Sequence, residues 1–144
     1  MIRSSVRIAF PIALCAALAL MPGTASFEVQ AQQQTPTEVF KAYRAALDKA
    51  SSYADVLPFM EAKGKAMVEA VPEQQRAGMF GYLKKFAGTF TDVAVTKETI
   101  TGDTAVLALS GKDPKGQAAT GSVPMTKEAS GWKVGNEKWS SAPK

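Results

Sequence analysis

The side chains that most often perform proton transfer and nucleophilic attack are scarce in this chain. Its 144 residues include no histidine and one cysteine, Cys15. Histidine is the side chain whose ordinary pKa lies nearest neutral pH, so the commonest general acid and base is missing. A Ser-His-Asp or Cys-His arrangement cannot be assembled from this sequence. The acid–base candidates that remain lie in the first part of the chain: Tyr43, Tyr53, Asp55 and Tyr82.

Metal and nucleotide sites also lack their sequence signatures. Zinc, copper and haem sites depend on histidine and cysteine ligands. Calcium loops space several acids closely, whereas Asp103 and Asp113 each stand alone in a turn-forming stretch. Neither a G-x-x-x-x-G-K-[ST] loop nor a G-x-G-x-x-G turn occurs. We therefore expect no metal and no cofactor.

The positive charge of the chain is modest and dispersed. The formal net charge is +4, and the lysines form only small pairs such as Lys63/Lys65 and Lys84/Lys85. Nucleic-acid-binding domains concentrate basic residues on one face. We therefore expect solvated surfaces here and no nucleic-acid partner.

The N-terminus has the pattern of a secretory signal peptide. Arg3 and Arg7 precede a charge-free apolar run, residues 8–20, which is short for a membrane span of about 20 residues. Small residues favour cleavage after Ala31, with Ala25 as the alternative, so that Cys15 is removed with the leader. This predicts a periplasmic or secreted protein with no stable membrane anchor. The expected domains are a signal peptide (1–31), a linker (32–35) and a single α+β domain (36–140).

The first half of the domain has helical signals. Thr35 and Glu38 form a capping-box pattern around Pro36, and the apolar residues that follow have helical spacing over 36–51. A second helical stretch begins with a Ser52/Asp55 box, is interrupted at Pro58 and continues to about residue 70. A third helix follows Pro72 and ends near Gly88. Two sets of residues are expected on the buried faces of the second and third helices: Val56, Phe59, Met60, Met67 and Val71, and Met79, Phe80, Leu83, Phe86 and Ala87.

The second half has strand signals. Four strands are expected, at about 91–100, 104–112, 117–127 and 131–139, separated by short turn sequences such as Asp113–Gly116. Connections this short imply an antiparallel meander. Gly121 and Pro124 in the third strand suggest a bulge or a sheet edge. No strand offers an acid at a clearly inward position, so we expect an interior free of ionisable groups. The predicted class is α+β, with three N-terminal helices packed on a curved four-stranded antiparallel sheet.

Two segments carry a resemblance to a known family. The stretch "TPTEVFKAYRAAL", residues 35–47, resembles the first helix of the nuclear transport factor 2-like superfamily, also called SnoaL-like or ketosteroid isomerase-like. The stretch "MTKEASGWKV", residues 125–134, is similar to its late hairpin. The resemblance implies a cystatin-like cone of helices and curved sheet around an apolar pocket. The candidates for the pocket lining are Phe40, Tyr43, Phe59, Met67, Phe80, Leu83, Trp132 and Trp139.

The two tryptophans are also candidates for the core. Trp132 and Trp139 lie seven residues apart, an odd offset that places them on opposite faces of an unbroken strand. A bend at Gly135 and Asn136 would change that. Burial of either indole in the core is the alternative to a role in binding.

Three functions are compatible with these observations. The first is a secreted, non-catalytic domain that binds a small apolar ligand or a protein partner in the cone. The second is a homo-oligomeric assembly module that pairs through the open sheet face, where the small and polar run Gly116–Ser122 would allow close approach. The third is an isomerase- or cyclase-like enzyme with a carboxylate base and a tyrosine in an apolar pocket. The absence of histidine, and of cysteine after Ala31, favours the first.

Overall fold

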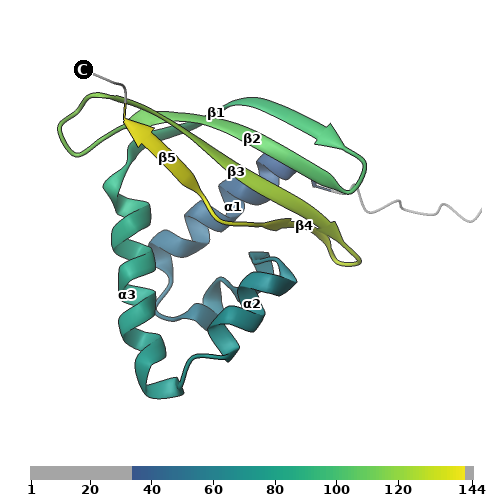
Figure 1. Cartoon of the computed structure of the whole chain (residues 1–144), viewed down its shortest axis with the longest axis vertical. Coiled ribbons are helices and arrows are strands. Elements are labelled where there is room, and N and C mark those ends of the chain that lie inside the picture. The colour runs from purple at the N-terminus through teal and green to yellow at the C-terminus, as the bar shows by residue number, and fades with distance from the viewer. Residues whose placement is uncertain (1–33, 142–144) are drawn as a thin grey trace, which may run out of the picture. The chain divides into compact units, whose positions relative to one another are not determined.

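The chain forms helices first and an antiparallel sheet afterwards, which confirms the α+β class. The computed structural model describes residues 34–141. Its helical elements are α1 (Pro36–Lys49), the short 3-10 helices η1 (Tyr53–Asp55) and η2 (Leu57–Phe59), α2 (Ala62–Glu69) and α3 (Glu73–Thr89) (Figure 1). Its strands are β1 (Thr91–Thr101), β2 (Thr104–Lys112), β3 (Ala118–Glu128), β4 (Gly131–Val134) and β5 (Lys138–Ser141). None of these helices has the length and apolarity needed to cross a membrane. The expected signal peptide and its cleavage after Ala31 lie outside the described residues.

Both capping patterns predicted from the sequence are present. At the start of α1, the Glu38 backbone N–H donates to the Thr35 hydroxyl, and the Thr35 N–H donates to the Glu38 carboxylate at 2.8 Å. Ahead of η1, the Asp55 carboxylate accepts the N–H groups of Ser51 at 2.8 Å and Ser52 at 3.1 Å. Each carboxylate satisfies donors that the first turn of a helix leaves without partners.

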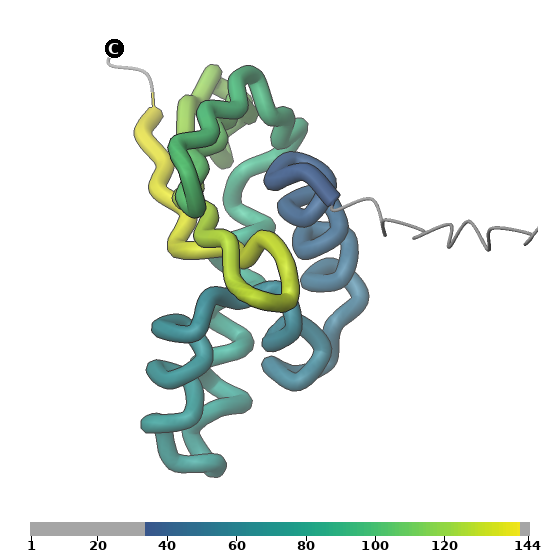
Figure 2. The backbone as a smooth tube through the Cα atoms, turned by 90° about the vertical axis from the view of Figure 1, so that its right-hand side faces the viewer, coloured from purple at the N-terminus to yellow at the C-terminus, as the bar shows by residue number. Residues whose placement is uncertain are grey.

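The second and third helices are less buried than their sequences predict. Met67 is 56% exposed and Phe86 is 45% exposed, so their expected places in the core are wrong. The sheet and α1 enclose the core, whereas α2 and α3 extend past the sheet (Figures 1 and 2). Only Val68 of α2, and Phe80 and Ala87 of α3, are fully buried.

The final strand is broken in two, so the sheet has five strands instead of the four expected. β4 and β5 both pair with β3, in the order β1-β2-β3-β4 with β5 beside β3. Met125 pairs with Val134, and Ser122 pairs with Lys138. Two residues of β3 therefore face the three-residue segment 135–137, which adds one residue as a bulge does.

Gly121 and Pro124 occur in β3 for reasons other than the expected bulge or sheet edge. Strand β3 is central and pairs regularly with β2, so neither residue marks an edge of β3 or a bulge within it. The Pro124 carbonyl accepts the Gly135 N–H at 2.9 Å, and its nitrogen faces the same side. A proline, which has no N–H, is tolerated there because the partner strand is interrupted.

The extra residue places both tryptophans on the same face of the sheet. Trp132 pairs with Lys127 and Trp139 pairs with Gly121, and these β3 positions share the face of the buried Val123 and Met125. Trp132 is buried in the core, which confirms its core alternative, and Trp139 packs against that core while partly exposed.

Trp139 lies across two glycines of the sheet. A Cβ at Gly121 would lie 2.8 Å from the Trp139 Cδ2 atom, and a Cβ at Gly111 would lie 3.2 Å from its Cη2 atom. Phe90 stacks on the other face of the indole, with ring centroids 4.4 Å apart and planes at 10°. The glycines of β2 and β3 therefore provide the space in which this aromatic stack sits.

We expect Gly121→Ala to lower the free energy of unfolding by about 1–3 kcal/mol, because the new methyl group overlaps the indole and the Lys138 carbonyl. The measurement is a urea unfolding curve. Gly78→Ala is the matched control, since nothing lies within 4 Å of that Cβ position on α3. The control should be neutral or stabilise by up to about 1 kcal/mol, as alanine does in a helix interior. Equal stability of the two variants would contradict the packing described.

Candidate functional site

The predicted pocket residues do not converge on one cavity. Tyr43 and Leu83 line a cavity between the helices and the bend after β4, which we call the helix–sheet cavity. Phe40, Phe80 and Trp132 are buried in the core, and Phe59 packs against the Tyr43 ring with centroids 6.3 Å apart. Met67 is exposed on α2, and Trp139 covers the sheet glycines. Most of the predicted set therefore serves packing.

The helix–sheet cavity has a volume of about 200 Å³ and a mixed lining. Its apolar lining residues come from Met60, α3 and the end of β4, and its polar lining residues come from α1, the N-cap of α2 and the bend at 135–137. The lining residues are Tyr43, Met60, Glu61, Gly64, Leu83, Phe86, Ala87, Val134, Gly135, Asn136 and Glu137. An apolar cavity with a few convergent polar groups is the usual form of a small-molecule site.

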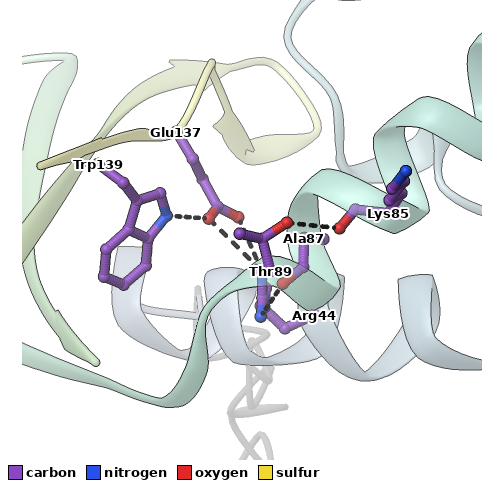
Figure 3. Close-up of polar contacts among 6 residues, drawn as sticks. All are labelled: Arg44, Lys85, Ala87, Thr89, Glu137 and Trp139. Carbon is purple, nitrogen blue, oxygen red and sulfur yellow. Dashed lines mark hydrogen bonds and ion pairs between the residues drawn. The ribbon is translucent and has the colours of Figure 1, made fainter. Parts of the chain in front are cut away.

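Glu137 is a candidate functional residue that the sequence pattern did not reveal. Its side chain is 7% exposed and pairs with Arg44 of α1 at 3.5 Å (Figure 3). The Trp139 indole N–H donates to the same carboxylate at 3.0 Å, and Arg44 also donates to the Ala87 carbonyl at 3.0 Å. The expectation of an interior free of ionisable groups is therefore wrong. The acid escaped notice because it lies in the bend between β4 and β5, where strand alternation does not apply.

Tyr43 borders the same cavity from α1. The residue is 6% exposed, and among the described residues no group is hydrogen-bonded to its hydroxyl. Every fully buried polar side-chain atom of the described part has a partner, so the Tyr43 hydroxyl oxygen must reach open space, which the cavity supplies. Burial, and secondarily the negative charge of Glu137, raises the pKa of Tyr43 to about 12. The hydroxyl is thus neutral at ordinary pH.

Glu61 lies at the start of α2, beside the end of β4. Its backbone N–H donates to the Val134 carbonyl at 3.1 Å, next to a bridge between Met60 and Val134. Glu61 is the N-cap of α2, yet its side chain makes no capping bond. Instead the carboxylate faces the cavity, where it accepts a long bond of 3.4 Å from the Thr126 hydroxyl.

The described domain has other hollows, which are more open. One of about 380 Å³ lies between α1 and the start of β1, and one of about 320 Å³ lies between η1, α2 and α3. Arg76 borders the latter and is occupied by bonds to the carbonyls of Val71 and Glu69. The helix–sheet cavity is the more enclosed site, and it is lined by the Glu61 carboxylate, which has one long hydrogen bond, and by the Tyr43 hydroxyl.

A carboxylate and a tyrosine share this cavity, as the enzymatic alternative requires. Two observations oppose proton transfer between Tyr43 and Glu137. The Glu137 carboxylate already accepts bonds from Arg44 and Trp139. The raised pKa of Tyr43 makes its hydroxyl a weaker donor to a developing oxyanion. Tyr43 and Glu137 are therefore better suited to recognising a polar group than to reacting with one.

Comparison with known proteins adds little to this geometry. No family model matches the chain, and none of the curated proteins matches it. Among solved structures, an NTF2-like protein of unknown function from Shewanella baltica OS155 matches at 17% identity over 76% of this chain and 92% of its own, with a TM-score of 0.46. The intermembrane space region of the chloroplast protein ARC6 matches at 14% identity over 76% of this chain and 99% of its own, with a TM-score of 0.36. The first carries the family description that the sequence resemblance suggested. Because both TM-scores are low, the fold class rests on the elements of this chain itself.

We expect Arg44→Met to lower the free energy of unfolding by about 2–3 kcal/mol, because it leaves the buried Glu137 carboxylate without its cation. Chemical denaturation followed by tryptophan fluorescence measures the change. Lys112→Met is the control: the Lys112–Asp92 pair is shorter, at 2.7 Å, but both side chains are more than half exposed. The control should leave the midpoint unchanged within error. An Arg44 variant as stable as the control would show that burial does not decide the contribution of the pair.

The raised pKa of Tyr43 predicts an alkaline loss of stability. In the unfolded chain this tyrosine loses its proton near pH 10, whereas the folded protein retains it to about pH 12, so the folded state binds more protons in that window. Stability therefore falls as the pH rises through it, by up to about 2–3 kcal/mol. Urea midpoints from about pH 9 to about pH 11.5 should fall more steeply for the wild type than for Tyr43→Phe, which lacks the titrating group. Parallel curves would contradict the burial of this hydroxyl.

Proposed function

We propose that this domain is a non-catalytic binding module that takes up a small amphipathic molecule in the helix–sheet cavity. The observation that carries the proposal is the lining of the cavity. Leu83, Phe86 and Val134 offer apolar contacts, and Tyr43 and Glu61 offer polar atoms with spare bonding capacity in the same cavity. Such a lining orients a molecule that has one apolar and one polar end.

The size of the cavity limits the ligand. Drug-sized ligands occupy pockets of roughly 300–1,000 Å³, whereas an enclosed space near 150 Å³ holds a benzene ring. A cavity of about 200 Å³ suits a single ring or a short chain with one polar group. Phe86, 45% exposed at the mouth, would cover the apolar end of such a ligand and lose exposed area.

The proposal includes export through the leader predicted at residues 1–31. A domain that acts by binding alone needs none of the absent histidine and cysteine chemistry, which supports the same interpretation. The assembly alternative is less favoured, because two residues of its motivating run, residues 116–122, have another use. Gly121 is small to accommodate Trp139, and Ala119 is buried.

Titration with 2-phenylethanol, followed by NMR, tests the proposal. We expect saturable shifts at Met60, Leu83 and Val134, which line the cavity, and smaller shifts elsewhere. Leu83→Trp, which fills the cavity, should abolish the saturable shifts. Tyr82→Trp adds the same ring at a 77% exposed position of α3 outside the lining and should retain them. Absence of saturation in the wild type, or equal binding by the Leu83 variant, would refute a binding function for this cavity.

A further inference from the structure

The charged residues that line the helix–sheet cavity are all acidic, although the protein as a whole is basic. Two carboxylates, Glu61 and Glu137, line it, and no lysine or arginine does. The formal net charge of the chain is +4. A cavity lined by one sign of charge selects ligands of the other sign.

The two carboxylates differ in how far their charge is already compensated by protein groups. Glu137 is paired with Arg44 and bonded by Trp139, so its charge is compensated from behind the cavity. Neither of the two ion pairs in residues 34–141 involves Glu61. Its described side-chain bond is the 3.4 Å contact with the Thr126 hydroxyl. Glu61 therefore presents an uncompensated negative charge to the cavity.

The Tyr43 hydroxyl is a further polar group in the lining, in addition to the two carboxylates. Tyr43, 6% exposed, borders the cavity with a hydroxyl for which the described residues provide no partner. Because every fully buried polar side-chain atom of the described residues has a partner, this hydroxyl oxygen opens onto the cavity, where a ligand or water can bond it. A neutral tyrosine hydroxyl can accept a hydrogen bond through its oxygen as well as donate its own proton.

We infer that the ligand is a small amphipathic amine, whose ammonium group is bound by the polar lining of Glu61 and Tyr43 and whose apolar part lies against Leu83 and Phe86. An ammonium group has three N–H donors and no acceptor, which matches a carboxylate and a hydroxyl oxygen. A carboxylate ligand would meet like charge, and an alcohol would leave the Glu61 charge uncompensated. This inference rests on the proposed binding function and specifies its ligand class.

Three probes of similar shape separate the possibilities: 2-phenylethylamine, 2-phenylethanol and 3-phenylpropanoate. Dissociation constants from NMR titration at neutral pH should rank the amine first, by at least about fivefold over the alcohol, and the carboxylate last. Equal affinity of amine and alcohol, or preference for the carboxylate, overturns the inference while the proposed binding function stands. Failure of all three to saturate overturns both.

Variants of the lining residues test which side chains cause the preference for the amine. Glu61→Gln should remove the advantage of the amine over the alcohol; the backbone bond to Val134 and the absence of a capping bond favour retention of the fold. Glu69→Gln, on the same helix but outside the lining, removes the same charge and should retain the preference. Tyr43→Phe, which breaks no described hydrogen bond, should weaken the amine severalfold. An amine preference that survives both lining variants overturns the inference.

Discussion

A carboxylate that is almost fully buried must be given partners, and the burial of Glu137 imposes this requirement on three parts of the fold. Its side chain is 7% exposed, and an uncompensated charge at such a position would be strongly destabilising. Arg44 supplies the opposite charge from α1, and the Trp139 indole supplies a hydrogen bond from β5. Arg44 also bonds the Ala87 carbonyl near the end of α3. The first helix, the third helix and the last strand are thereby held in a single arrangement.

The bend at residues 135–137 makes this arrangement sterically feasible. Its one extra residue turns Trp139 to the inner face, where the indole can reach Glu137 and lie over Gly111 and Gly121. Pro124 of β3 accepts the Gly135 N–H beside the interruption, so the proline and the bend are parts of one feature. A regular strand would have placed Trp139 on the solvent face and Glu137 beyond the reach of Arg44.

Features that depend on local chemistry could be predicted from the sequence. The Thr35/Glu38 and Ser52/Asp55 boxes and the order of helices and strands follow from spacing within a few residues, and the structure contains them. The exposure of Met67 and Phe86 could not be predicted, because helical spacing marks an apolar face without showing whether the sheet extends far enough to cover it. Glu137 was missed for a related reason. Its partners, Arg44 and Ala87, are distant in sequence, and only the bend brings them together.

Packing and helix capping do not explain why a glutamate occupies position 61 beside the cavity. Serine, threonine, aspartate and asparagine are preferred at helix N-caps because their short side chains reach the backbone N–H groups of the first turn. Glu61 occupies the N-cap of α2 without making that bond. Interaction with the helix dipole favours an acid there, but a capping aspartate would gain the same interaction and the bond as well. The longer side chain instead places an oxygen 3.4 Å from where a side chain at Gly135 would begin, at the edge of the cavity. A Cβ at residue 135 would first meet the Pro124 carbonyl oxygen at 2.9 Å and the Pro124 ring at 3.0 Å, so glycine is needed there for the close approach to β3. Glu61 is then the residue that presents a charged group to a hollow that packing left unfilled.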